Sequence, residues 1–251
     1  AGFGVLWLLP ENQPSPIFAK SSQNLTAFHY RLIRFYLLGV IACIGLACLG
    51  DGWLWCLWAA IALGLVAMAY WRGVAIFQKQ SNGKLTAGST ALCLPYLLGA
   101  RLNIVYWLQG KAKSTVICDG VFVGSITVSR QFDAVLDCCA ELPCCKRPSV
   151  YEQALMLDLV PPSVNELCQA ARKLDRLQAE NAQVLVACAL GYGRSVAVVL
   201  TWLLATGRVP NLEQAINTVK CVRPKMAISY TVCERIELAS QQFHLEIKNG
   251  I

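Results

Sequence analysis

The sequence predicts an α/β domain in which helices flank a central sheet, preceded by a two-helix transmembrane hairpin. One observation is a surplus of apolar residues. Of the 251 residues, 56% are hydrophobic and 15% are charged, whereas an ordinary soluble domain has about 45–50% and about 25%. The other observation is a change of pattern near Ser114, after which short apolar runs alternate with stretches of helical periodicity. That alternation is typical of helices packed on a sheet.

Two uncharged apolar stretches, residues 35–50 and 53–71, lie on either side of Asp51 and Gly52. Each approaches the length of about 17–25 residues that a bilayer-spanning helix needs, and aromatic residues lie at their ends, as at membrane interfaces. The alternative is a helical hairpin buried in a soluble core, which a domain of this size could hardly cover. We therefore expect residues 35–71 to form a transmembrane hairpin.

The charge distribution predicts the orientation of this hairpin. Through residue 109 the chain has seven basic residues and two acidic ones, and the basic residues flank the apolar stretches. By the positive-inside rule both ends of the hairpin lie in the cytoplasm. The same distribution argues against nucleic acid as a partner, because a nucleic-acid binder concentrates its basic residues in the folded domain.

The segments on either side of the hairpin are also apolar. Residues 1–34 form an N-terminal segment, in which residues 2–10 are a candidate for the end of an earlier span. Residues 72–113 form a connecting segment, whose part 90–109 we expect at the membrane interface or against the next domain rather than as a third span. Three residues interrupt its apolar pattern: Pro95, Arg101 and Asn103.

Residues 114–251 carry the α/β pattern. The expected strands are 120–128, 132–142, 154–160 and 182–188. The expected helices begin at Ser163, Arg194, Asn211 and about Ser229. Ser163 with Glu166, and Asn211 with Gln214, have the spacing of residues that cap a helix N-terminus.

One stretch of this domain has a pattern suited to chemistry: a strand, Cys188, a glycine-bearing loop, and Arg194 at the start of a helix. The N-terminus of a helix is a ready anion site, and its positive field favours the thiolate form of a cysteine. Gly191 and Gly193 let the backbone approach a bound phosphate closely. Arg194 offers two parallel hydrogen bonds to phosphate oxygens, and Ser195 can donate a hydrogen bond to the sulfur. The pattern indicates a phosphate cradle with a nucleophile at its base.

The motif Cys-x5-Arg-Ser resembles the signature loop of the protein tyrosine and dual-specificity phosphatase superfamily, and the similarity covers roughly residues 114–247. The resemblance implies a dual-specificity-phosphatase-like sheet and a phosphate-binding loop made of Ala189, Leu190, Gly191, Tyr192, Gly193 and Arg194. The chain also looks like bacterial inner-membrane proteins that join several spans to such a domain. That likeness implies a multi-pass protein of the inner membrane with a cytoplasmic catalytic domain.

By this resemblance the mechanism is double displacement without a metal or other cofactor. Cys188 attacks phosphorus and forms a phosphocysteine, Asp158 acts as general acid and then as general base, and Arg194 with the loop amides stabilises the phosphoryl oxygens. The implied substrate is a phosphate monoester, on either a phosphoprotein or a phospholipid headgroup, and the sequence does not separate the two.

Two residues leave alternatives open. Asp158 has the second interpretation of an ordinary turn aspartate, and Asp133 and Asp137 are weaker candidates for the acid. Ala187 stands where the family usually has a histidine that supports the loop and keeps the cysteine ionised. The alternative function is therefore a weak or inactive pseudophosphatase that binds a phosphorylated partner at the membrane. A purely structural membrane protein would leave the loop unexplained.

The thirteen cysteines show no disulfide framework, which favours a reducing compartment. The doublets Cys138-Cys139 and Cys144-Cys145 do not have the spacing of a zinc site. Core packing is the leading interpretation, and a redox partner for Cys188 is the alternative. "VRPK" (222–225) is similar to a segment common after the loop in this superfamily, or else a solvated turn.

Overall fold

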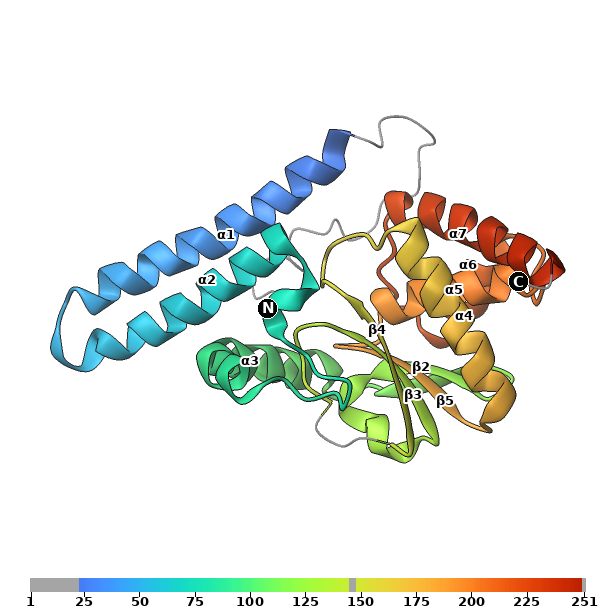
Figure 1. Ribbon diagram of the computed structural model, residues 1–251, viewed down its shortest axis with the longest axis horizontal. Helices are drawn as coiled ribbons and strands as arrows, with labels where there is room; N and C mark the ends of the chain where they lie inside the picture. Colours follow the sequence, from blue (N-terminus) through green and yellow to red (C-terminus); the bar gives the residue numbers. More distant parts are fainter. Residues whose placement is uncertain (1–22, 145–147, 250–251) are drawn as a thin grey trace. The chain divides into compact units, whose positions relative to one another are not determined.

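The computed structural model describes residues 23–144 and 148–249, which form two compact units (Figure 1). The first unit contains the described residues up to Gln78 together with Thr86–Gln109. The second contains Lys79–Leu85 and the described residues from Gly110 onward. The candidate earlier span at residues 2–10 lies outside the described residues.

The first unit is helical. Its elements are α1 (Gln23–Ala47), η2 (Asp51–Trp55), α2 (Cys56–Arg72), η3 (Val74–Phe77) and α3 (Ala87–Leu108). Helices α1 and α2 pack against each other, and Tyr36 stacks on Tyr70 with ring centroids 5.5 Å apart. The Nε1 of Trp58 on α2 donates to the carbonyl of Ala91 on α3 at 2.9 Å. The expected hairpin is therefore a pair of packed helices joined through η2.

Helix α3 differs from the sequence expectation because it is one continuous helix that runs through Pro95. The hydroxyl of Thr86 caps its start by accepting from the Ser89 N–H at 3.2 Å. Asn103 is buried inside the unit, so its polar group does not interrupt an outer apolar face. The described residues therefore contain three helices long and apolar enough to cross a membrane, 29–47, 52–72 and 87–108, whereas the sequence predicts two.

The second unit contains a five-stranded sheet in the order β1-β2-β5-β3-β4. The strands are β1 (Ser114–Cys118), β2 (Val121–Ser125), β3 (Ala134–Cys139), β4 (Val150–Met156) and β5 (Val184–Cys188). Only the edge strand β1, which the sequence analysis did not assign, pairs antiparallel. Because β2, β5, β3 and β4 are parallel, their carboxyl ends meet at one edge of the sheet, which is where α/β domains bind ligands.

Four helices gather on one side of this sheet (Figure 1): α4 (Val164–Glu180), α5 (Arg194–Ala205), α6 (Leu212–Val222) and α7 (Tyr230–Asn249). Helices α4 and α5 contact the sheet, and α7 packs against both of them. Every residue of α5 except Leu204 is buried, so the helix that follows the loop is held from all sides. The predicted fold class, a central sheet flanked by helices, is confirmed.

The predicted helix starts are accurate. Ser163 and Glu166 form a complete capping box at the start of α4, and the Asn211 side chain accepts from the Gln214 N–H at 2.9 Å at the start of α6. The strand ends are less accurate: the strand expected at 154–160 is β4, which ends at Met156. Asp158 therefore lies in the turn after the strand.

The segment Lys79–Leu85 is a small hairpin that belongs to the second unit. Lys79 and Leu85 form an isolated antiparallel bridge, and the Gln80 N–H donates to the Lys84 carbonyl at 2.8 Å. In sequence this hairpin lies between α2 and α3. The α/β unit is thus completed by residues from a distant part of the chain.

Candidate active site

The site begins where β5 ends at Cys188 and the chain turns into α5 at Arg194. Cys188 is 3% exposed, and its Sγ accepts two hydrogen bonds, from the Gly191 N–H at 3.1 Å and from the Ser195 hydroxyl at 3.2 Å. The thiol therefore lies at the base of a loop that turns the Gly191 amide toward the sulfur.

Gly191 is the residue that the loop conformation requires to be glycine. Its φ is +77°, and a Cβ at this position would lie 2.6 Å from the carbonyl carbon of Gly124 on β2. Gly193 has a φ of −118°, and a Cβ there would approach only the Ala227 carbonyl oxygen, at 3.7 Å. Of the two glycines that the sequence analysis singled out, the close backbone approach thus depends on Gly191.

Two buried side chains hold the loop from outside. The Ser125 hydroxyl at the end of β2 donates to the Ala189 carbonyl at 2.7 Å. The guanidinium of Arg223 lies over the Tyr192 ring at 5.1 Å from its centroid. Arg223 also donates to three carbonyls: Ala112 at 2.8 Å, Lys113 at 3.1 Å and Val123 at 3.0 Å. The loop is therefore braced by the sheet on one side and by the segment after α6 on the other.

Arg194 is 5% exposed and lies in a cluster of acceptors from two neighbouring strand ends. Its two terminal nitrogens bind the two carboxylate oxygens of Glu141 at 2.8 and 2.7 Å. One also donates to the Met156 carbonyl at 2.9 Å, and the other lies 3.1 Å from a carboxylate oxygen of Asp158. The buried Nε has no hydrogen-bond partner among the described residues. An unsatisfied buried donor on a cation is costly, so an anion that accepts from it would bind favourably.

The pKa values of the two carboxyls beside Arg194 are shifted in opposite directions. Burial alone would raise the pKa of Glu141, but the ion pair and hydrogen bonds with Arg194 lower this pKa below its usual range. Burial raises the pKa of Asp158, and the Glu141 charge adds to this effect while Arg194 opposes it. Two neighbouring carboxyls with pKa values pushed apart are typical of sites that divide structural and acid–base roles.

The structure thus brings four predicted site residues to one edge of the sheet: Cys188, Arg194, Ser195 and Asp158. It does not do so for the two weaker acid candidates. Asp133 precedes β3 at the opposite, amino-terminal edge, where it accepts from the Gln183 N–H at 3.2 Å. Asp137 is fully buried and paired with Lys79. The interpretation of these two aspartates as alternative acids is wrong. The Asp133 carboxyl lies at the other edge of the sheet, and the Asp137 carboxylate is buried against Lys79, so neither can reach a leaving group beside Cys188.

Three residues of the site escaped the sequence analysis. Glu141 follows the carboxyl end of a buried parallel strand, which is the signal that could have identified it. Ser125 carries no distinctive pattern. Arg223 lies in the "VRPK" segment, whose interpretation as a solvated turn is wrong for this residue, since Arg223 is 3% exposed.

Cys138, Cys139 and Cys144 are buried, as core packing predicts, and burial raises the pKa of the Cys138 and Cys139 thiols well above their usual range. Cys145 lies outside the described residues. Within the described part of the chain, no group of three or more histidine, cysteine, aspartate or glutamate residues is placed to hold a metal ion.

Comparison with known proteins agrees with this geometry. Residues 124–239 match the family model of the dual specificity phosphatase catalytic domain. This region begins at the end of β2 and includes β3, β4, β5, the loop at Cys188 and helices α4, α5 and α6. No curated protein matches the sequence.

Several solved structures are similar to about half of the chain. Tk-PTP in its active form is 25% identical over 52% of this chain and 97% of its own, with a TM-score of 0.46. PTPMT1 in complex with PI(5)P is 15% identical over 54% of this chain and 99% of its own, with a TM-score of 0.44. A mouse putative dual specificity phosphatase complexed with zinc tungstate is 16% identical over 55% of this chain and 91% of its own, with a TM-score of 0.46.

Proposed function

We propose that the chain is a membrane-anchored, cysteine-dependent phosphatase that hydrolyses phosphate monoesters through a phosphocysteine. The observation that carries the proposal is the placement of Cys188. Its sulfur accepts from the Gly191 amide and the Ser195 hydroxyl at the N-terminus of a helix that begins with Arg194. The match of residues 124–239 to the dual specificity phosphatase catalytic domain supports the same chemistry.

In the first step the Cys188 thiolate attacks phosphorus, and the bond between phosphorus and the ester oxygen breaks. Asp158 gives its proton to the leaving oxygen, so that an alcohol departs and the phosphoryl group remains on sulfur. The raised pKa of Asp158 suits this role, because the carboxyl keeps its proton at a higher pH than an ordinary aspartate.

In the second step water attacks the phosphocysteine. The Asp158 carboxylate takes a proton from this water, inorganic phosphate leaves, and the sulfur departs as a thiolate. The Ser195 hydroxyl, 3.2 Å from the sulfur, stabilises the departing charge by a hydrogen bond. The loop amides and Arg194 stabilise the phosphoryl oxygens in both steps.

The substrate class that we propose is a phosphate monoester on a protein or on a phospholipid headgroup. The apolar helices of the first unit support a location at the lipid bilayer, because three of them have the length and composition of membrane spans. We further propose a multi-pass protein of a bacterial inner membrane with its catalytic domain in the cytoplasm.

The second candidate is a pseudophosphatase that binds a phosphorylated partner without turnover. The observation that favours it is Ala187, which is fully buried beside the cysteine and provides no ring to support the loop. In that case the loop would still bind an oxyanion, while the sulfur would not react.

The experiment measures phosphate release from a small aryl phosphate by the purified full chain in detergent. Cys188→Ser should abolish turnover, because serine is not ionised at this position. Cys221→Ser is the matched control, since Cys221 is an exposed thiol on α6, and it should leave turnover unchanged. Binding of tungstate without turnover would favour the pseudophosphatase. If the folded protein shows no binding of tungstate and no turnover, both candidates are contradicted. Phosphopeptides and vesicles containing lipid phosphates then distinguish the substrate classes.

A further inference from the structure

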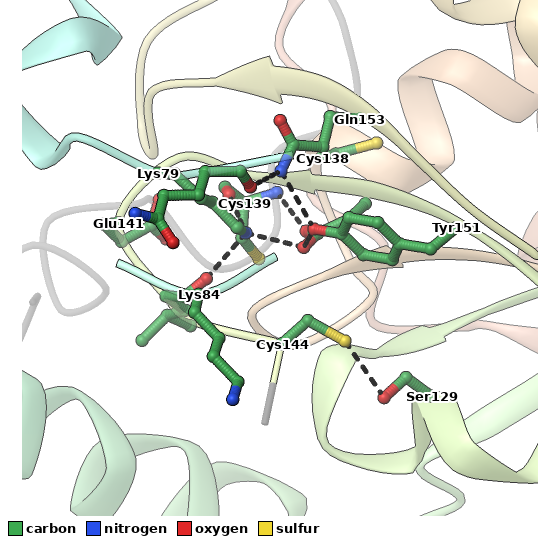
Figure 2. A network of polar contacts seen from close by, with 12 residues as sticks. Lys79, Lys84, Ser129, Cys138, Cys139, Glu141, Cys144, Tyr151 and Gln153 are labelled. Carbon is green, nitrogen blue, oxygen red and sulfur yellow. Dashed lines mark hydrogen bonds and ion pairs between the residues drawn. The ribbon is translucent and has the colours of Figure 1, made fainter. Parts of the chain in front are cut away.

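A second buried polar cluster of the second unit is centred on Lys79, which comes from the hairpin Lys79–Leu85 (Figure 2). The side chains of Lys79 and Asp137 are both fully buried, and the Lys79 Nζ lies 2.6 Å from the Asp137 carboxylate. The same nitrogen donates to the carbonyls of Cys139 at 2.5 Å and Leu142 at 2.7 Å. All three donors of the ammonium group are therefore used.

The hairpin is fixed to the sheet by further contacts. The Cys144 N–H donates to the Gly83 carbonyl at 2.8 Å, and the Gln153 side chain donates to the Gln80 carbonyl at 2.6 Å. A Cβ at Gly83 would lie 2.9 Å from both Cys144 and Tyr151, so the hairpin backbone lies directly against these side chains. The Tyr151 hydroxyl also donates to Asp137, at 2.6 Å.

Lys79 and Arg194 bind the same short stretch of chain. Residues 137–142 offer Lys79 the Asp137 carboxylate and two carbonyls, and they offer Arg194 the Glu141 carboxylate and the Cys138 carbonyl, the latter at 3.4 Å. The carbonyls of Cys139 and Leu142, which Lys79 holds, lie on either side of Glu141 in the sequence. Fixing these two carbonyls restricts where the Glu141 carboxylate can lie, and Glu141 in turn orients the guanidinium of Arg194.

The charges of the cluster also connect Lys79 with Glu141. The Lys79 ammonium is close enough to Glu141 to contribute to the lowered pKa of that carboxyl, after the larger effect of Arg194. Removing Lys79 would leave Asp137 buried without its cation, and an unpaired buried charge strongly disturbs its surroundings. The segment from Asp137 to Leu142 would lose its three contacts with Lys79. Glu141, which binds Arg194, lies within this segment.

We propose that Lys79 is a positioning residue for the phosphate-binding arginine: by holding the segment 137–142 it orients Glu141 and, through Glu141, Arg194. This inference rests on the proposed function of Arg194 and extends it to a residue 45 positions before the region that matches the phosphatase family. The catalytic unit is then complete only with a hairpin that lies in sequence between two apolar helices.

The test compares Lys79→Met with Lys84→Met in the full chain. Lys84 is an exposed lysine on the same hairpin, which makes it a matched control for loss of one positive charge. Two quantities are measured per folded molecule: the dissociation constant for tungstate, by calorimetry, and kcat/KM for an aryl phosphate, with the folded fraction from the thermal unfolding signal. The double variant Lys79→Met, Asp137→Asn removes both charges of the buried pair and guards against a folding defect caused by an unpaired aspartate.

Lys79→Met and the double variant should weaken tungstate binding and lower kcat/KM, each by about tenfold or more, the effect of losing one well-placed hydrogen bond to a charged group. Lys84→Met should change neither quantity. A merely structural role would lower the folded fraction and leave both quantities per folded molecule unchanged, which would overturn the inference. Loss of folded protein in both Lys79 variants would count against it as well.

The tungstate measurement separates this inference from the proposed function. If the parent chain binds tungstate without turnover, the phosphatase proposal fails, while weaker binding in Lys79→Met still supports the positioning role. If the folded parent chain does not bind tungstate, Arg194 does not bind oxyanions and both proposals are wrong.

Discussion

At the scale of single residues, Arg194 is held in advance of any ligand. Five protein oxygens contact its terminal nitrogens, and the two contacts of the bidentate pair with Glu141 are the shortest of them. An arginine whose plane is fixed loses less conformational freedom when it binds phosphate. The orientation of the guanidinium is therefore a property of Glu141 as much as of Arg194.

We predict that Glu141→Gln lowers kcat/KM and weakens tungstate binding by about tenfold or more, because a charge-assisted bidentate pair becomes at most one neutral hydrogen bond. Steady-state kinetics and calorimetry check this prediction. Glu152→Gln is the control, since Glu152 lies on the neighbouring strand β4 and pairs with Arg176. Equal effects of the two substitutions would contradict the assigned role of Glu141.

Asp158 is the other residue whose protonation matters. We predict that Asp158→Asn lowers kcat by about 10²–10⁴-fold, the usual contribution of a general acid. In the parent enzyme kcat should fall as pH rises through the pKa of Asp158, because the proton needed by the leaving group is then lost. Since this pKa is raised, the fall should occur at a higher pH than for an ordinary aspartate.

The pH–rate profile of Asp158→Asn should lack this fall. Asp133→Asn, at the other edge of the sheet, should keep both the rate and the profile. A profile that Asp158→Asn leaves unchanged would assign the acid to another group.

At the scale of elements, the loop and β2 touch backbone to backbone. A methyl group at Gly191 would collide with the backbone of Gly124, whereas a methyl group at Gly124 would collide with Lys113 and Ser114. Ser125, the residue after Gly124, binds the Ala189 carbonyl. The position of β2 thus determines the curvature of the loop.

We predict that Gly191→Ala abolishes tungstate binding and lowers the free energy of unfolding by about 1–3 kcal/mol, through strain at positive φ and overpacking. Gly193→Ala should have a clearly smaller effect, since its Cβ would meet only ordinary van der Waals contact. Chemical denaturation and calorimetry compare the two variants. The reverse order would show that the loop conformation differs from the one described.

The sequence predicts these elements unevenly, and the reasons are physical. Helix starts are predictable because capping is local: Ser163 and Asn211 act on residues three positions away. The loop at Cys188 is predictable because its residue types and spacing serve one chemistry. The partners of Arg194 are not, since Glu141 lies 53 positions earlier and reaches it only through the pairing of parallel strands. Lys79 is further still, and its hairpin has no pattern that separates it from a solvated loop.

At the scale of the whole molecule, the two compact units do not follow the order of the chain. The hairpin Lys79–Leu85 belongs to the α/β unit although helical residues precede and follow it. A fragment that begins at residue 110 therefore contains the whole sheet but lacks the cation that neutralises Asp137.

We predict that Asp137→Asn has opposite effects in two contexts. In the full chain it should lower the free energy of unfolding, because it leaves the buried Lys79 without its carboxylate. In the fragment 110–251 it should raise stability, because it removes a buried carboxylate that has no cation. Thermal unfolding of the four proteins checks this prediction, and effects of the same sign in both contexts would contradict the importance of the buried pair.

The nucleophilic role of Cys188 is tested by detecting the covalent intermediate. The full chain is mixed with an aryl phosphate, quenched rapidly under denaturing conditions and digested, and the peptide that contains Cys188 is examined by mass spectrometry. We predict a phosphoryl group on Cys188 in the parent chain and its absence in Cys188→Ser. Turnover without this adduct, or an adduct on another residue, would show that Cys188 is not the nucleophile.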